Sequence, residues 1–385
     1  MSGIYLHIPF CKSKCAYCNF FSLVTEKKMD DYVSALKKEI INRKSYLGDD
    51  VVKTIYFGGG TPSLLPIKYV EEILELLHEN YNIISNPEVT LEINPDTIDK
   101  DKMFALKRLG VNRMSVGIQS FNDDDLRYLG RRHDSRHALQ VLDDLSSVGF
   151  DRITLDLIYG MPTLTEEKWN HNLDIFFSTG ISHLSAYALT VEPKTILGQK
   201  IEKEELQEVS EEDAIRHYNI LVERTKENGF EHYEISNFAK EGCRSQHNSI
   251  YWQDVKYLGL GPSAHSYDGN SRQWNVSNLT KYIQFVNADI DTDADTDTDM
   301  GRYYEREILS KEDKYNEYVM TTLRTSWGCN VGKIERDYGE SYAHNFLKNI
   351  KKYLDSGIML MKDNSFILTD EGMLFADGIA ADLFV

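Results

Sequence analysis

The chain has 385 residues, of which 41% are hydrophobic, so it is long enough for one large catalytic domain and a smaller second one. Acidic residues outnumber basic ones by 61 to 43, and the formal charge of −18 disfavours non-specific attraction to nucleic acid or to anionic lipid. The amino terminus has no signal-peptide pattern and no apolar run approaches about 18 residues, so we expect a cytoplasmic protein without a transmembrane segment.

Six short apolar or β-branched runs recur in the first half of the chain, and most are followed by a polar turn and a helical pattern. The runs lie at 3–8, 52–57, 88–93, 113–118, 152–158 and 183–189. Apolar residues at three- and four-residue spacing predict helices at 30–46, 67–80, 101–109, 123–129, 135–148 and 165–177. This alternation predicts an α/β fold of parallel βα units. Because six strands are indicated and not eight, we expect a partial (β/α)6 barrel, with a doubly wound sheet as the alternative. In both architectures, chemistry belongs at the carboxyl ends of the strands.

The second half of the chain predicts a different organisation. A helix at 211–228 precedes an irregular stretch, and then comes the acidic repeat 289–299, DIDTDADTDTD. We interpret this repeat as a solvated loop or linker, because it lacks the Gly and the terminal Glu of a calcium-binding loop. Helical patterns follow the repeat at 313–325, 331–337 and 343–356, and a hairpin is expected to turn at Asp363 and Asn364. These elements predict a C-terminal α+β, winged-helix-like domain. We expect it to serve as a packing or lid module. We therefore expect a core domain, a linking region and a C-terminal domain at 1–235, 236–300 and 301–385.

Three of the five cysteines, Cys11, Cys15 and Cys18, are spaced C-x3-C-x2-C in the loop after the first predicted strand. Such crowding favours metal ligation in a reducing compartment over a disulfide framework. Three thiolates can bind three irons of a [4Fe–4S] cubane and leave the fourth iron open to a chelating amino and carboxylate group. The alternatives are a zinc site, which needs a fourth ligand such as His7, or three buried structural cysteines.

Further motifs accompany this loop at the ends of the predicted strands. They are Tyr5-x-His7-Ile8-Pro9-Phe10, Gly58-Gly59-Gly60-Thr61-Pro62, Glu92, Gly117-Ile118-Gln119-Ser120-Phe121 and Asp156. Together with the cysteines they resemble the radical S-adenosylmethionine (SAM) family over nearly the whole chain, which implies a [4Fe–4S] cluster on Cys11, Cys15 and Cys18. The resemblance also implies SAM contacts from Tyr5, Tyr17, Gly59, Gly60, Thr61, Glu92, Gln119, Arg131 and Asp156. Each of these alone could be a turn glycine or a satisfied polar residue, and their recurrence at successive strand ends is the evidence.

More narrowly, the motifs resemble the branch that contains the oxygen-independent coproporphyrinogen III dehydrogenases and the HemW heme chaperones. In the dehydrogenases the cluster motif continues to a fourth cysteine, C-x3-C-x2-C-x-C, whereas here that position is Phe20. The segment HNSIYW matches the HNxxYW signature of the chaperones, which implies a heme site at His247, Asn248, Tyr251 and Trp252. A neutral imidazole can ligate the iron while the aromatic rings pack on the porphyrin. The alternative is a capped turn whose aromatic residues lie in the core.

His265 and Cys243 are candidates for a second heme ligand, although the loop of His265 could instead form the lower edge of the SAM site, and Cys329 is expected to be packed. The resemblance implies a heme chaperone that binds a cluster, SAM and heme and passes heme to an acceptor protein, such as one of the respiratory chain. An electron donor would serve the cluster. The alternatives are a radical enzyme of the coproporphyrinogen III dehydrogenase type, which cleaves SAM to a 5′-deoxyadenosyl radical, and a scaffold with a purely structural cluster.

Overall fold

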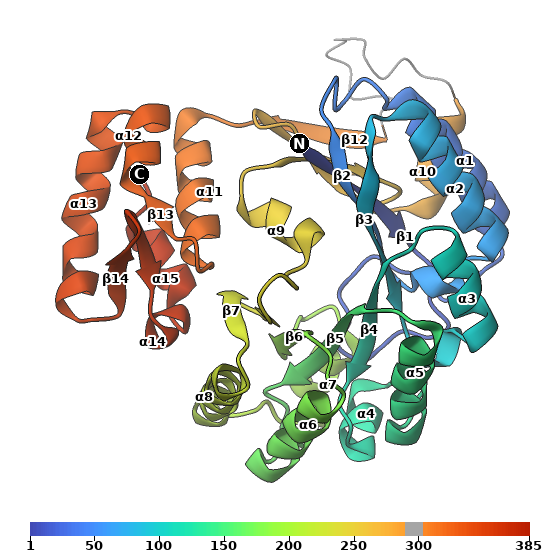
Figure 1. The fold of residues 1–385 in the computed structure, drawn as a ribbon, viewed down its shortest axis with the longest axis horizontal. Coiled ribbons are helices and arrows are strands. Elements are labelled where there is room, and N and C mark those ends of the chain that lie inside the picture. The colour runs from blue at the N-terminus through green and yellow to red at the C-terminus, as the bar shows by residue number, and fades with distance from the viewer. Residues whose placement is uncertain (289–302) are drawn as a thin grey trace.

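A curved parallel sheet forms the centre of the computed structural model, which describes residues 1–288 and 303–385 (Figure 1). Its six parallel strands follow one another in the chain and in space, and each pairs with the next. They are β1 Ser2–Ile8, β2 Val52–Gly59, β3 Ile83–Ile93, β4 Arg113–Gln119, β5 Arg152–Tyr159 and β6 His183–Ala188. All six predicted strands are present, so the partial (β/α)6 barrel is confirmed.

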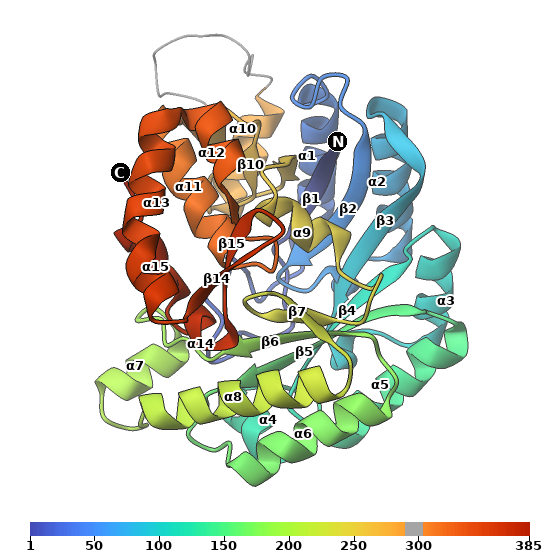
Figure 2. The same ribbon diagram turned by 60° about the vertical axis from the view of Figure 1, so that its left-hand side comes forward.

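Helices cover the outer, convex face of this sheet, as Figures 1 and 2 show. They are α1 Met29–Asn42, α2 Ile67–Asn80, α3 Lys100–Arg108, α4 Asp123–Leu129, α5 Ser135–Val148 and α6 Glu166–Ser178, with 3-10 turns η1 Pro62–Leu64 and η2 Pro95–Thr97. Each predicted helix is found, and the largest difference is that α1 ends at Asn42 instead of 46. Caps set the bounds of α5, because Asp134 accepts a hydrogen bond from the His137 amide and Gly149 ends the helix at φ 87°.

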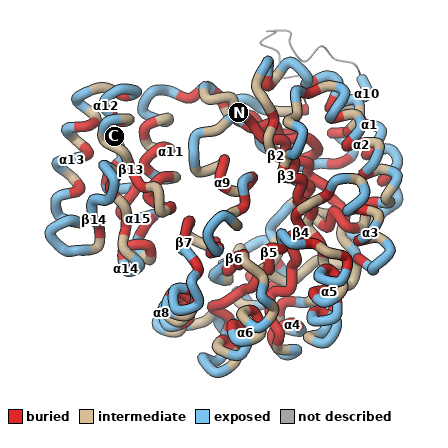
Figure 3. The backbone as a smooth tube through the Cα atoms, in the orientation of Figure 1, coloured by how far each residue is buried: buried red, intermediate tan, exposed pale blue. Residues whose placement is uncertain are grey.

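Apolar and polar side chains alternate along the strands, and the two sets face opposite sides of the sheet. In β1, Ile4, Leu6 and Ile8 are fully buried in the hydrophobic core, whereas the rings of Tyr5 and His7 lie against the glycines that end β2. Figure 3 shows the buried backbone concentrated in the strands. The barrel therefore has an apolar outer layer under the helices and a polar interior.

The sheet continues at both edges, to 12 strands among the described residues. Beyond β1 lie β9 Lys256–Leu260, parallel to β1, and the antiparallel strands β10 His265–Tyr267, β11 Ser271–Asn275 and β12 Tyr304–Ile308. Beyond β6 lie the antiparallel strands β8 Asn237–Ala239 and β7 Glu231–Glu234. The helices of this half are α7 Ile196–Glu202, α8 Glu211–Glu227, α9 Gln246–Trp252 and α10 Leu279–Asn287. The stretch expected to be irregular is therefore partly an extension of the sheet.

The C-terminal part combines helices with a small antiparallel sheet of order β13-β15-β14. Its elements are α11 Lys311–Leu323, β13 Cys329–Asn330, α12 Val331–Tyr338, α13 Glu340–Asp355, β14 Met359–Lys362, β15 Ser365–Leu368, α14 Asp370–Met373 and α15 Ala376–Asp382. The predicted hairpin turns at Asp363 and Asn364, both with positive φ. The acidic repeat 289–299 lies outside the described residues. No helix in the described ranges is long and apolar enough to cross a membrane.

Candidate functional site

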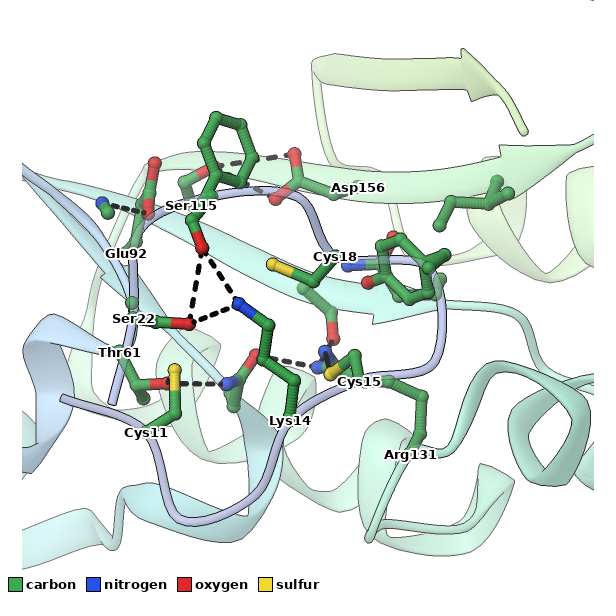
Figure 4. A pocket seen from close by; sticks show the side chains of 18 of the residues that line it. Cys11, Lys14, Cys15, Cys18, Ser22, Thr61, Glu92, Ser115, Arg131 and Asp156 are labelled. Carbon is green, nitrogen blue, oxygen red and sulfur yellow. Dashed lines mark hydrogen bonds between the residues drawn. The ribbon is translucent and has the colours of Figure 1, made fainter. Parts of the chain in front are cut away.

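A cavity of about 460 Å³ opens at the carboxyl ends of β1–β6, and Figure 4 shows some of the side chains that line it. Its volume is in the range of small-molecule sites. The structure brings together in its wall most of the residues predicted from sequence: Cys11, Cys15, Cys18, Tyr17, Gly59, Gly60, Thr61, Glu92, Gln119, Arg131, Asp156 and Asn248. Four predicted residues do not line it, namely Tyr5, His247, Tyr251 and Trp252.

The cysteine loop follows β1 and is fixed by backbone hydrogen bonds at both of its ends. The Cys11 amide donates to the Leu23 carbonyl at 3.0 Å, and the Leu23 amide donates to the Pro9 carbonyl at 2.7 Å. In the middle of the loop, the Ala16 amide donates to the carbonyl of Leu129, the last residue of α4, at 3.0 Å. The loop is therefore held in place by the barrel, although it has no regular secondary structure of its own.

Two sulfur atoms of this loop receive hydrogen bonds from residues that follow β2 and α4. Figure 4 shows these side chains. The Thr61 hydroxyl donates to Cys11 Sγ at 3.5 Å, and Arg131 Nη1 donates to Cys15 Sγ at 3.4 Å. Burial raises the pKa of the Cys18 thiol, and the neighbouring Cys15 and Cys11 raise it further. Hydrogen bonds to the sulfurs are one of the means by which proteins tune iron–sulfur clusters, so the residues present fit such a group.

The arrangement is not that of a single-metal site. In residues 1–288 and 303–385, no group of three or more His, Cys, Asp or Glu side chains is placed to hold one metal ion. A cubane does not need such convergence, because each cysteine binds a different iron. His7, the ligand that a zinc site would have needed, has its Nε2 2.8 Å from the Phe21 carbonyl oxygen.

Two buried carboxylates form the part of the wall that lies deeper in the barrel. Glu92 accepts hydrogen bonds from the Tyr56 hydroxyl at 2.8 Å and from the Gly59 amide at 3.2 Å, and Asp156 accepts one from the Ser115 hydroxyl at 3.1 Å. Burial raises the pKa of Glu92 to about 7, and the nearby Asp156 adds to this rise. Burial also raises the pKa of Asp156 to about 7. The pair gives the cavity a cation-binding wall near neutral pH.

Arg131 connects the cysteine loop to the strand ends. Besides Cys15, its guanidinium donates to Asn94 Oδ1 and to the Gly117 carbonyl, each at 2.6 Å. A Cβ at Gly117 would lie 3.0 Å from Asn94 Oδ1 and 3.3 Å from Arg131 Nη2, so the glycine leaves room for this network. Gln119 closes β4 at φ 71°, a conformation that side chains rarely adopt and that is often found at functional sites.

Several residues that line the cavity were not predicted from sequence, namely Tyr56, Asn94, Ser115, Ser185 and Tyr187. Four of them stand at alternate positions of β2, β4 and β6, on the polar face of each strand. The alternation of polar and apolar residues in these strands would have indicated them, because every second residue of a barrel strand faces the interior.

The histidine motif forms α9, a short helix whose first turn contacts β2 and β3. Ser245 caps it by accepting from the Asn248 amide, and the buried Glu88 of β3 accepts from the His247 amide at 2.9 Å. His247 is fully buried, with Nδ1 2.8 Å from Thr54 Oγ1 and Nε2 2.8 Å from the Tyr251 hydroxyl. Burial lowers the pKa of His247 to about 3, so the imidazole is neutral. The motif thus has the geometry of the alternative reading, a capped segment whose aromatic residues lie in the core. Both nitrogens of the His247 ring lie within hydrogen-bonding distance of other side chains.

The remaining candidates lie outside the cavity wall. Trp252 packs beneath the guanidinium of Arg324, 5.6 Å from the ring centroid. His265 is exposed at the start of β10, its ring 6.3 Å from that of Trp274. Cys243 is partly buried, and its backbone carbonyl accepts a hydrogen bond from Arg113 Nη1 at 3.4 Å. Cys329 is buried, as expected, and burial raises its pKa to about 12.

Comparison with known proteins places this geometry in a family. The Radical SAM superfamily profile matches residues 5–175, and that of the HemN C-terminal domain matches 309–375. The chain is 31% identical over 382 residues to the heme chaperone HemW of Bacillus subtilis (strain 168), covering 98% of both chains. It is 34% identical over 389 residues to the mitochondrial radical S-adenosyl methionine domain-containing protein 1 of Danio rerio, covering 98% of this chain and 86% of that protein.

Among solved structures, the coproporphyrinogen III oxidase HemN from Escherichia coli matches with a TM-score of 0.84 at 24% identity, covering 100% of this chain and 90% of HemN. At this identity the match bears on the fold, and the fold is that of a radical SAM protein. The near full-length sequence similarity to HemW identifies the family within this superfamily. This chain belongs to the radical SAM superfamily and, within it, to the HemW family.

Proposed function

We propose that the protein is a heme chaperone that holds a [4Fe–4S] cluster on Cys11, Cys15 and Cys18, binds SAM in the adjoining cavity, and passes heme to an acceptor protein. The observation that carries the proposal is the three-thiol loop opening onto a cavity whose deeper wall holds two carboxylates. The three thiolates would hold the cluster by three of its irons, and the cluster, once reduced by an electron donor, would supply an electron to SAM bound at the fourth iron. Glu92 and Asp156 attract the cationic groups of SAM, while the Gly59–Thr61 strand end lets the backbone approach the ligand closely.

Two features favour the chaperone over the dehydrogenase. Phe20 stands where the dehydrogenase motif has its fourth cysteine, and its side chain is 69% exposed at the mouth of the cavity. The second feature is the histidine motif, together with the name of the B. subtilis relative. A neutral His247 is the form that binds iron, but Nε2 becomes available only when the Tyr251 hydroxyl turns away from it. Heme binding at this site therefore includes a rearrangement of α9.

The deciding experiment is anaerobic reconstitution followed by heme titration and a coproporphyrinogen III turnover assay on the same sample. We expect a Soret band that saturates with heme and no decarboxylated product. Protoporphyrinogen formed at a useful rate would overturn the chaperone proposal in favour of the radical enzyme, for which the intact cluster loop and SAM cavity are the supporting observation. A sample that binds no heme would also contradict the proposal.

Gly59→Val is expected to abolish the SAM-induced change in the electron paramagnetic resonance spectrum of the reduced cluster. Gly59 has φ 107°, and a Cβ there would lie 2.8 Å from the His7 ring, so valine must displace the strand end that faces the ligand. Gly110→Val is the matched control, because Gly110 has φ 94° but open space around it. A spectrum that still responds fully to SAM in Gly59→Val would contradict the assigned strand-end contact.

SAM binding is expected to tighten as the pH rises through about 7. The raised pKa values of Glu92 and Asp156 leave both carboxyls largely protonated below that pH, and only the charged forms attract a cationic ligand. Equilibrium binding measured between pH 5.5 and 8.5 tests this. The double variant Glu92→Gln/Asp156→Asn should bind weakly with a flat profile, and an unchanged pH dependence in that variant would show that other groups titrate.

A further inference from the structure

Tyr56 of β2 lies between the cavity and the histidine motif and contacts both. Its hydroxyl donates to Glu92 Oε1 at 2.8 Å in the cavity wall. Its ring stacks on the imidazole of His247, with 4.9 Å between the ring centroids and 26° between the planes. Segments that are almost 200 residues apart in sequence thus meet through one side chain.

We propose that Tyr56 is a positioning residue for both sites, in which the hydroxyl orients Glu92 toward SAM and the ring orients the imidazole of His247. This inference rests on the proposed function and assigns a role to a residue outside the predicted contacts of either ligand. The two parts of the side chain have separate tasks, so different substitutions can separate them.

The side chains around Tyr56 are closely packed. A Cβ at Gly58 would lie 2.9 Å from the Tyr56 ring, 2.8 Å from the Tyr5 ring and 3.1 Å from Glu92 Oε1. Only a glycine at this position lets the two rings and the carboxylate occupy the same layer of the barrel interior. The position of Tyr56 is therefore determined by its neighbours, which is what a positioning residue requires.

The hydroxyl is one of two donors that favour the charged form of Glu92, the other being the Gly59 amide. Among the other titratable groups nearby, Asp156 raises the pKa of Glu92. The charge of Glu92 in turn raises the pKa values of Tyr5, Tyr187 and Tyr251. No cation among the described residues is in hydrogen-bonding contact with Glu92. Loss of the Tyr56 hydroxyl therefore raises the pKa of Glu92 further.

The Tyr56 ring restrains movement of the His247 imidazole perpendicular to its own plane, a movement that the hydrogen bonds to its nitrogens do not restrain. Thr54 and Tyr251 engage the two nitrogens in or near the plane of the imidazole, whereas Tyr56 covers one face. Tyr5 is more distant, with 6.5 Å between ring centroids. When Tyr251 releases Nε2, the Tyr56 ring and Thr54 are the contacts that still hold the imidazole in place.

The first test is the pH dependence of SAM binding to the reconstituted full chain. Tyr56→Phe keeps the ring and loses the donor to Glu92, and we expect the binding midpoint to move upward by about one pH unit, since a hydrogen bond to a charged group is worth about that much. Tyr81→Phe is the matched control, because it removes a buried hydroxyl that donates to the Ile40 carbonyl outside the barrel interior. An unshifted midpoint in Tyr56→Phe would overturn the role of the hydroxyl.

The second test is the Soret band of the heme complex. Tyr56→Leu removes the ring and is expected to move the band or broaden it, whereas Tyr56→Phe retains the stacking and the wild-type spectrum. Identical spectra for wild type and Tyr56→Leu would overturn the role of the ring. Should His247→Ala bind heme as wild type does, the proposed heme ligand fails, but the pH shift of Tyr56→Phe still tests the SAM part independently.

Discussion

Replacement of Cys11, Cys15 or Cys18 by alanine is expected to abolish both the iron content and the broad visible absorption of the reconstituted protein. In the proposed cluster each thiolate would hold a different iron, so the loss of one would leave two protein ligands and two exposed irons. The effect should be nearly all-or-none for each cysteine, because the described cavity wall contains no other thiol that could substitute. Iron and sulfide analysis after anaerobic reconstitution measures it.

The other two cysteines serve as matched controls for this prediction. Cys243→Ala and Cys329→Ala should retain iron and absorption, because neither residue lines the cavity. Cys329→Ala is expected to lower the free energy of unfolding by about 1–2 kcal/mol, since it removes a fully buried thiol group from the C-terminal core. If either control lost its iron as completely as Cys15→Ala, the three-cysteine ligand set would be wrong.

Much of the barrel could be predicted because its strands and helices carry strong local signals. The run 113–118 predicts β4 to within one residue, and the apolar spacing from Ser135 to Val148 predicts the bounds of α5. The cysteine loop was equally clear, since three soft ligands within one short loop have few structural explanations. In these segments the local pattern and the tertiary environment favour the same conformation.

The strands at the two edges of the sheet could not be predicted in the same way. β8 has three residues and β10 has three, which is too short for periodicity to be recognised. Such strands form because a neighbouring strand offers unpaired backbone groups, as β1 does for β9. Their existence depends on long-range pairing, and the local sequence carries little of that information.

The position of the histidine motif was the main feature that sequence could not supply. The capping residue Ser245 is visible in the sequence, but Glu88 and Thr54, which hold α9 against the barrel, come from two separate strands. His247 lies more than 150 residues beyond Glu92 in the sequence, so nothing local indicates that the two side chains are near each other. The structure places Asn248 in the cavity wall, and the Tyr56 side chain contacts both Glu92 and His247.

The effect of His247→Ala on heme is expected to be large, with affinity reduced at least about tenfold and a shifted Soret band, while the cluster remains intact. A lost iron ligand can account for this, but His247 is also a fully buried side chain bonded to Thr54, so alanine leaves a cavity. Thr54→Val is therefore needed beside it, because it removes the same hydrogen bond and keeps the imidazole.

Tyr251→Phe separates ligation from packing, because the two explanations predict opposite results for it. Its hydroxyl lies 2.8 Å from Nε2 and competes with iron for that nitrogen, while its ring stands edge-on to the imidazole at 5.3 Å and is retained in phenylalanine. If His247 ligates heme, removal of the competing hydroxyl should tighten heme binding by about three- to tenfold, the size of one net hydrogen bond. If His247 only packs the barrel, Tyr251→Phe should weaken heme binding or leave it unchanged, and His247→Ala should resemble Thr54→Val. Heme titrations of the four proteins, each with its cluster content measured, decide between these outcomes.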